Sequence, residues 1–274
     1  NPTLVCVPGL LGGPADFANY INDWAQTFHV IVLDPDRGRW QGGPRALSSE
    51  EMEAGLYNSS AEKIDEILVH LGIPSIFLMG VSLGGKIIYD FATKFPTKFL
   101  SAVVIDVGPG PFEQTDLFRF IDGMVEHLDL TLPFVDMKQQ LREQIPDRNL
   151  RSMIQTQIFY PGGKPPARWK AGMGNFGRLF VSLLKAQNIN EQFESLEAVD
   201  EYLANAGRFI YVLRATRLTG VCATTLQKMA ELKSLKMTVV DDASHFMHVT
   251  HKERVGRAVA RLHPKFKETS MQIS

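Results

Sequence analysis

Short apolar runs alternate with amphipathic stretches along the first 107 residues of the chain. Runs typical of buried strands occupy residues 3–7, 29–33, 75–79 and 100–105. Patterns with helical spacing occupy residues 64–71 and 86–95. Strand and helix patterns that alternate in this way predict a mostly parallel sheet with helices on both faces.

The alternation stops after residue 107 and resumes about a hundred residues later. The intervening chain carries helical apolar patterns at residues 117–128 and 176–184. Strand-like runs return at residues 208–213 and 236–240, and a helical pattern follows at residues 250–262. We therefore expect an α/β core made of residues 1–108 and 207–274, with residues 109–206 inserted as a helical cap.

A tight glycine-rich turn separates the run at 75–79 from the helical pattern at 86–95. It reads Gly-Val-Ser-Leu-Gly-Gly and places Ser82 at its tip. Side chains two positions either side of the serine would clash with the opposite arm, which explains Gly80 and Gly84. The pattern predicts a nucleophile elbow, and the alternative is a glycine-rich turn without chemistry. Because a serine hydroxyl is a poor nucleophile, the hypothesis requires a base, an orienting group and oxyanion donors.

His245 is the best candidate for the base among seven histidines. It follows the predicted strand at 236–240 and lies late in the chain, in a loop that can reach the elbow. The other histidines fall on predicted helices, on a strand or near the chain end, and we expect them to be packed or solvated: His29, His70, His127, His248, His251 and His263.

The orienting carboxylate has to be sought in a chain with a long stretch free of acidic residues. No Asp or Glu occurs between Glu201 and Glu231, a stretch that contains the predicted strand at 208–213 and the loop after it. Asp106 directly follows the buried run at 100–105 and lies at the edge of the sheet where ligands bind. We therefore predict that Asp106 orients the base.

Two alternatives to this role of Asp106 stay open. Its carboxylate could simply cap the turn formed by Gly108 and Pro109. Asp242 could instead supply the acid, although it lies very close in sequence to His245.

The loop after the first predicted strand can supply oxyanion donors. Residues 8–13 read Pro-Gly-Leu-Leu-Gly-Gly, a turn able to aim a backbone N–H at a developing negative charge. The expected donors are the N–H of Leu83, next to the nucleophile, and the N–H of Leu10, with that of Leu11 as the alternative.

Together these segments resemble the α/β-hydrolase fold, and more narrowly the small serine esterases whose acid follows the sixth strand of that fold. The resemblance covers nearly the whole chain, and residues 80–86, 99–105 and 106–109 match the elbow, strand and acid in order and spacing. Two features depart from the family pattern. Pro8 stands where most relatives have a histidine, and the Asp-Pro-Asp-Arg-Gly loop at residues 34–38 lacks the glycine and serine that usually follow.

The resemblance implies a serine hydrolase that cleaves carboxylic esters or thioesters and needs no cofactor. The same triad serves C–C bond hydrolases and perhydrolases, and a binding protein on this fold without catalysis is a further alternative. Dehalogenases and epoxide hydrolases of this fold use an aspartate nucleophile, so Ser82 argues against both.

Composition agrees with a soluble enzyme that acts on small molecules. The 274 residues are 45% hydrophobic and 22% charged, and the net charge of −1 gives no basic footprint for nucleic acid or an anionic membrane. Two cysteines do not suggest a disulfide framework, and no Cys and His cluster has zinc spacing. We expect a cytoplasmic protein without a membrane span, a metal or a nucleic-acid partner, and leave its oligomeric state open.

Overall fold

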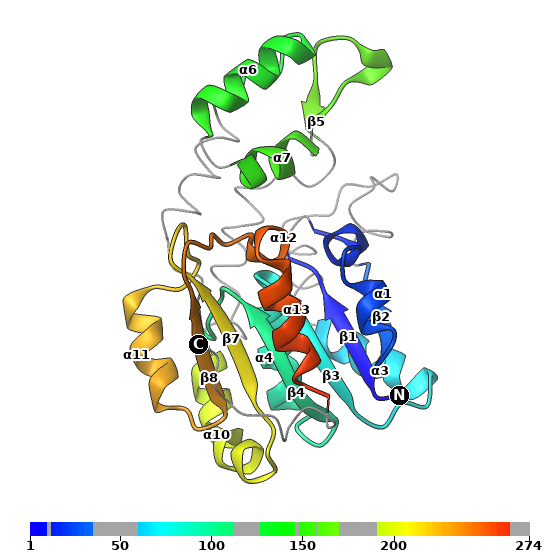
Figure 1. Ribbon diagram of the computed structural model, residues 1–274, viewed down its shortest axis with the longest axis vertical. Coiled ribbons are helices and arrows are strands. Elements are labelled where there is room, and N and C mark those ends of the chain that lie inside the picture. Colours follow the sequence, from blue (N-terminus) through cyan, green and yellow to red (C-terminus); the bar gives the residue numbers. More distant parts are fainter. Residues whose placement is uncertain are drawn as a thin grey trace.

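A parallel sheet forms the centre of the protein, as seen in a computed structural model (Figure 1). The structure describes residues 1–9, 12–34, 60–111, 127–145, 148–156, 158–169 and 191–263. Among these residues six strands pair in the order β2-β1-β3-β4-β7-β8, all in parallel. They are β1 (Thr3–Val7), β2 (His29–Val32), β3 (Ile76–Val81), β4 (Phe99–Ile105), β7 (Ile210–Ala215) and β8 (Leu235–Val240). The prediction of a mostly parallel sheet is confirmed.

The central strands are apolar on both sides because the sheet separates two hydrophobic layers. Successive side chains of a strand point to opposite faces, so Val5 and Val7 of β1 enter one layer while Leu4 and Cys6 enter the other. Strands buried on both faces read as continuous apolar runs in the sequence, which is why the sequence predicts them well.

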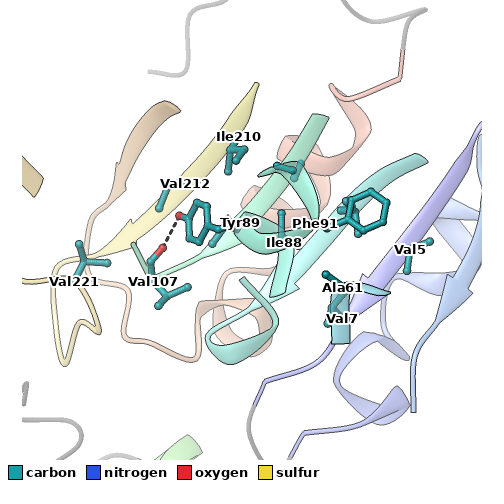
Figure 2. Packing of buried hydrophobic residues seen from close by; sticks show 14 of the residues in the cluster. Val5, Val7, Ala61, Ile88, Tyr89, Phe91, Val107, Ile210, Val212 and Val221 are labelled. Carbon is teal, nitrogen blue, oxygen red and sulfur yellow. Dashed lines mark hydrogen bonds between the residues drawn. The ribbon is translucent and has the colours of Figure 1, made fainter. Parts of the chain in front are cut away.

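Helices cover both faces of the sheet. On one side, the hydrophobic layer includes buried residues of α3 (Ser60–His70), α4 (Leu83–Lys94), α10 (Gln192–Asn205) and α11 (Ala223–Glu231). Figure 2 shows part of this layer, in which Ile88 and Phe91 of α4 pack with strand residues. The opposite layer contains the 3-10 helix η1 (Pro14–Phe17), α1 (Ile21–Trp24), α12 (Met247–Thr250) and α13 (Lys252–Ala260).

The chain between β4 and β7 adds no strand to this sheet within its described residues. It forms α6 (Phe134–Gln144), α7 (Arg148–Thr156), the 3-10 helix η2 (Pro161–Gly163) and an antiparallel pair, β5 (Ile158–Phe159) with β6 (Arg168–Trp169). In Figure 1, α6, α7 and β5 lie beyond the edge at which the parallel strands end.

This inserted part differs in detail from the sequence-based expectation. The short hairpin was not expected, because two-residue strands carry no readable period. Most of the predicted apolar pattern at 117–128, and all of that at 176–184, lie outside the described residues. Helix α10 packs its Leu196 and Leu203 into the same core layer as α4. The division into a core and a cap at residues 109–206 stays a prediction.

Candidate active site

Ser82 makes the whole turn between strand β3 and helix α4. Its backbone has φ 51° and ψ −115°, a conformation that non-glycine residues rarely adopt. Its N–H donates to the Ile105 carbonyl at 3.1 Å, and its own carbonyl accepts from Gly85 at 2.8 Å. The strained turn is therefore fixed at both ends, and it leaves the Ser82 side chain only half-buried.

Three glycines allow the backbone around the serine to approach this closely. A β-carbon at Gly80 would lie 2.7 Å from the backbone of Gly84, and one at Gly84 would lie 2.2 Å from the carbonyl oxygen of Val7. A β-carbon at Gly9 would lie 3.5 Å from the Cβ of Ser82. The backbone at the end of β1 therefore packs directly against the turn at Ser82, with no room for side chains at Gly80 and Gly84.

One of the two expected oxyanion donors lies in the described structure. Leu83 is the first residue of α4, a position whose backbone N–H has no acceptor within the helix. Leu10 and Leu11 lie outside the described residues. Pro8 precedes them, and its carbonyl oxygen would lie 2.7 Å from a β-carbon at Gly84, so the start of this loop packs against the elbow.

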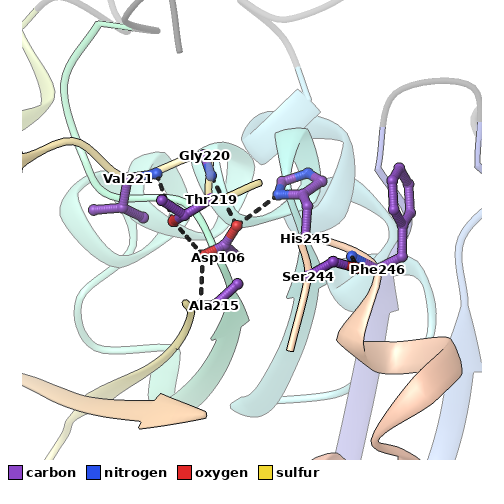
Figure 3. A network of polar contacts seen from close by, with 8 residues as sticks. All are labelled: Asp106, Ala215, Thr219, Gly220, Val221, Ser244, His245 and Phe246. Atoms are coloured by element: carbon purple, nitrogen blue, oxygen red, sulfur yellow. Dashed lines mark hydrogen bonds and ion pairs between the residues drawn. The ribbon is translucent and has the colours of Figure 1, made fainter. Parts of the chain in front are cut away.

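Asp106 is fully buried at the end of β4, with φ 49°, and its carboxylate is surrounded by donors (Figure 3). Oδ1 accepts from the Ala215 N–H at 2.8 Å and from the Thr219 hydroxyl at 2.7 Å. Oδ2 accepts from the Gly220 N–H at 2.8 Å and lies 2.8 Å from His245 Nδ1. These partners offset the cost of burying a charged carboxylate.

The loop after β7, which lacks an acid, thus supplies donors to an acid from the neighbouring strand. The sequence did not predict that Thr219 and Gly220 donate hydrogen bonds to Asp106, because neither residue type indicates such a role by itself. The carboxylate of Asp106 faces this loop and His245. Asp242 is exposed and pairs with Arg217.

His245 lies in the loop after β8 and is 5% exposed. A carboxylate beside Nδ1 favours the tautomer with its proton there, which leaves the Nε2 lone pair free to accept a proton. Gly220 makes room for the ring, since a β-carbon there would lie 3.2 Å from His245 Cε1. The Phe246 ring meets the imidazole edge-on, with centroids 5.5 Å apart.

The structure brings these candidates to one edge of the sheet. Ser82 follows Val81 and Asp106 follows Ile105, and these two strand-end residues are paired between β3 and β4. Within the described chain the Ser82 hydroxyl makes no hydrogen bond to His245. Bonds of this kind are often long before substrate binds.

A second buried histidine lies near the first. His248 is 5% exposed, and its Nδ1 finds no hydrogen-bond partner among the residues that the structure describes. Burial, together with the nearby His245, lowers the pKa of His248 to about 4. Its imidazole is therefore neutral at physiological pH.

Neither a metal site nor a membrane helix is found in the described chain. No group of three or more His, Cys, Asp or Glu residues there is arranged to hold a metal ion. Among the described helices, none combines the length and the apolar character needed to cross a membrane.

Comparison with known proteins decides the fold. An esterase of a marine microorganism superimposes with a TM-score of 0.71 over 96% of this chain and 95% of its own, at 16% identity. Residues 2–127 match the family described as alpha/beta hydrolase fold. The chain has the α/β-hydrolase fold.

Two further proteins extend the comparison. The thioesterase domain from the curacin biosynthetic pathway has a TM-score of 0.64, with 16% identity, over 94% of this chain and 91% of its own. A Haemophilus influenzae protein named provisionally as an esterase/lipase is 24% identical over 113 residues. That match covers 41% of this chain and 37% of the length of the relative. At 16% identity the structural likeness shows the fold alone.

Proposed function

We propose that this protein is a serine hydrolase that cleaves carboxylic esters or thioesters through an acyl-enzyme on Ser82. The observation that carries the proposal is the contact between His245 Nδ1 and the buried carboxylate of Asp106, at 2.8 Å. A buried Asp and His pair is the arrangement that turns a serine hydroxyl into a nucleophile. It occurs at the sheet edge where the strained elbow holds Ser82.

The proposed reaction has two halves. Ser82 Oγ attacks the carbonyl carbon while His245 Nε2 accepts the hydroxyl proton, and His245 then returns this proton to the departing alcohol or thiol. In the second half, His245 takes a proton from the water that attacks the acyl carbon, and it returns this proton to Ser82 Oγ as the bond to serine breaks and the carboxylic acid leaves. Asp106 holds the imidazole ring in place and stabilises its positive charge in both halves.

The oxyanion of each tetrahedral intermediate needs donors that are already in position. The N–H of Leu83 is suited to this role because it is free of the helix ladder and adjacent to the nucleophile. The N–H of Leu10 is the second proposed donor, from the family resemblance.

A fluorophosphonate probe tests the nucleophile directly, because it reacts covalently with an activated serine. We expect labelling of the unmutated protein and of Ser75→Ala, in which the lost hydroxyl lies at the opposite end of strand β3. We expect no labelling of Ser82→Ala. Labelling that persists in Ser82→Ala would assign the reactive group to another residue.

Turnover of a substrate panel tests the bond that is cleaved. The panel contains p-nitrophenyl esters from acetate to decanoate, acyl thioesters and a carbon-linked diketone. We expect hydrolysis of esters or thioesters. Cleavage of the diketone alone would support a C–C bond hydrolase, and the absence of both labelling and turnover would favour a binding protein.

A further inference from the structure

Lys86 is a buried lysine that the proposed chemistry does not use. It lies one helical turn after Ser82 on α4, and only 2% of its surface is exposed. Burying an ammonium group is costly unless it is hydrogen bonded. Its Nζ donates to the carbonyl oxygen of Gly110, four residues beyond Asp106.

Gln192 also contacts Gly110, and it contacts the backbone of Lys86 as well. It is the first residue of α10 and is 1% exposed. Its amide nitrogen donates to the carbonyl of Lys86 and to Oδ1 of Asp90, both at 2.8 Å. Its amide oxygen accepts from the Gly110 N–H at 3.3 Å. Gly110 is thus held by Lys86 at its carbonyl and by Gln192 at its N–H.

These two contacts matter because of where they fall in the chain. Gly110 and Gln192 bracket residues 111–191, which contain α6, α7 and the β5–β6 hairpin. The residues on either side of segment 111–191 therefore meet at one buried patch of α4, the helix that follows Ser82. Gly110 has φ 83°, and a β-carbon there would lie 2.7 Å from the Phe193 ring, so this junction also requires glycine.

The stretch between the acid and this junction is held by the same helix. The Tyr89 hydroxyl, on α4, donates to the carbonyl of Val107 at 2.9 Å (Figure 2). Tyr89 is fully buried, and burial raises the pKa of its phenol. The backbone from Val107 to Gly110 is thus attached to α4 at both of its ends.

We propose that Lys86 and Gln192 are positioning residues that fix both junctions of segment 111–191 to α4 and thereby set which acyl groups the site accepts. This inference rests on the proposed esterase function. Helices α6 and α7 lie beyond the edge at which the parallel strands end (Figure 1). In this proposal a long acyl chain extends from Ser82 toward them, whereas an acetyl group stays next to the nucleophile. Loosening the junctions should weaken binding of long acyl chains and leave the chemical step in place.

The experiment compares Lys86→Met, Gln192→Leu and the double variant, with Lys94→Met as the matched control. Lys94 lies on the same helix but is exposed and pairs with Glu62. For octanoate esters we expect KM to rise roughly tenfold in each single variant, since one lost buried hydrogen bond to a charged group corresponds to about that factor. For acetate esters, kcat and KM should stay within about twofold of the unmutated values.

The double variant tests whether the two residues act together. Because both hold Gly110, we expect its effect to be clearly smaller than the product of the single effects. Equal losses on acetate and octanoate, or effects that multiply independently, would overturn the proposal.

Hydrogen exchange separates this proposal from the proposed function. In the full-length chain we expect faster exchange in the peptides covering residues 106–111 and 191–205 of both single variants, with Lys94→Met unchanged. Unchanged exchange at both junctions would overturn the proposal that Lys86 and Gln192 clamp these junctions to α4, even if the protein is an active esterase. If the unmutated protein hydrolyses no ester, the esterase proposal and the specificity role fail together, whereas the exchange result still decides whether the clamp exists. Circular dichroism identifies any variant that fails to fold, and the other single variant then carries the test.

Discussion

His245 Nδ1 lies 2.8 Å from Oδ2 of Asp106, although the two residues are 139 positions apart in the chain. The contact joins the loop after β8 to the end of β4, two strands that are not neighbours in the sheet. Between them lies the end of β7, whose following loop donates to the same carboxylate through Gly220. Asp106 and His245 are therefore held together across the end of β7, where the last strand residue and the following loop contribute only backbone and hydroxyl donors.

Replacing Asp106 with Asn should lower kcat strongly. The amide is uncharged and does not stabilise a positive imidazole, and it favours the wrong tautomer of His245. We expect a loss of roughly 10³- to 10⁴-fold in kcat for p-nitrophenyl acetate. Asp242→Asn serves as the control, because the exposed Asp242 pairs with Arg217, and it should keep full activity. An active Asp106→Asn enzyme would contradict the proposed role of the acid.

Thr219→Val should reduce activity without abolishing it. The substitution keeps the shape of the side chain but removes the hydroxyl that donates to Asp106 at 2.7 Å and accepts from the Val221 N–H at 3.1 Å. A hydrogen bond to a charged group contributes about 1.5–3 kcal/mol, so we expect kcat to fall by about tenfold or more. Thr219→Ser should recover most of the activity. Steady-state kinetics on one ester distinguishes the pair, and equal rates in both variants would argue against a role for the hydroxyl.

Gly220→Ala should displace the base. The added β-carbon would lie 2.7 Å from the backbone oxygen of Asp106, which is closer than packing allows, and 3.3 Å from His245 Nδ1, a contact that the ring must relieve by shifting. We expect kcat to drop by at least about tenfold, since small displacements of catalytic groups are costly. Gly256→Ala on α13 is the control, because its nearest neighbour, Tyr20, would be 3.9 Å away. The slower rate should accompany slower fluorophosphonate labelling, and normal labelling would indicate that the ring keeps its place.

His248 should make the stability of the protein depend on pH. Its pKa is lowered from 6.5 to about 4 in the folded chain, so between these values the unfolded chain binds the extra proton. His248 therefore does not reduce the free energy of unfolding above about pH 6.5. As the pH falls from 6.5 toward 4, protonation of the unfolded chain lowers this free energy, by at most roughly 3 kcal/mol.

Urea denaturation at several pH values measures this contribution. We expect the free energy of unfolding to fall less between pH 6.5 and 4.5 in His248→Phe than in the unmutated protein. The control His29→Phe, at an exposed position of β2, should follow the unmutated protein. If the free energy of unfolding changes with pH equally in His248→Phe and in the unmutated protein, the pH dependence does not come from His248.

The central strands of the sheet could be predicted closely from the sequence, because β1, β3 and β4 are buried on both faces. The run at residues 3–7 coincides with β1, and the run at 100–105 is one residue shorter than β4. Helix α4 begins three residues before its predicted start, since Gly84 and Gly85 conceal its first turn from propensity arguments. Strand β7 is displaced by two residues from the predicted run at 208–213.

The candidate site was predictable only in part. Ser82, Asp106 and His245 stand in motifs or directly after apolar runs, so the chain itself indicates them. The surroundings of Asp106 were not predictable, because Thr219 and Gly220 contact it from more than a hundred positions away. Lys86 reads as an ordinary exposed helix residue, and its burial depends on a segment that joins the core from far along the sequence.

The donors that the β7 loop offers to Asp106 bear on how such an enzyme changes over generations. Strands β4 and β7 are adjacent, so a carboxylate at the end of either one can stand beside the same imidazole. An ancestor that carried acids at both places would have kept its base oriented while either one was lost. In the proposed hydrolase, the position of the imidazole therefore leaves two neighbouring strand ends from which a carboxylate can orient it.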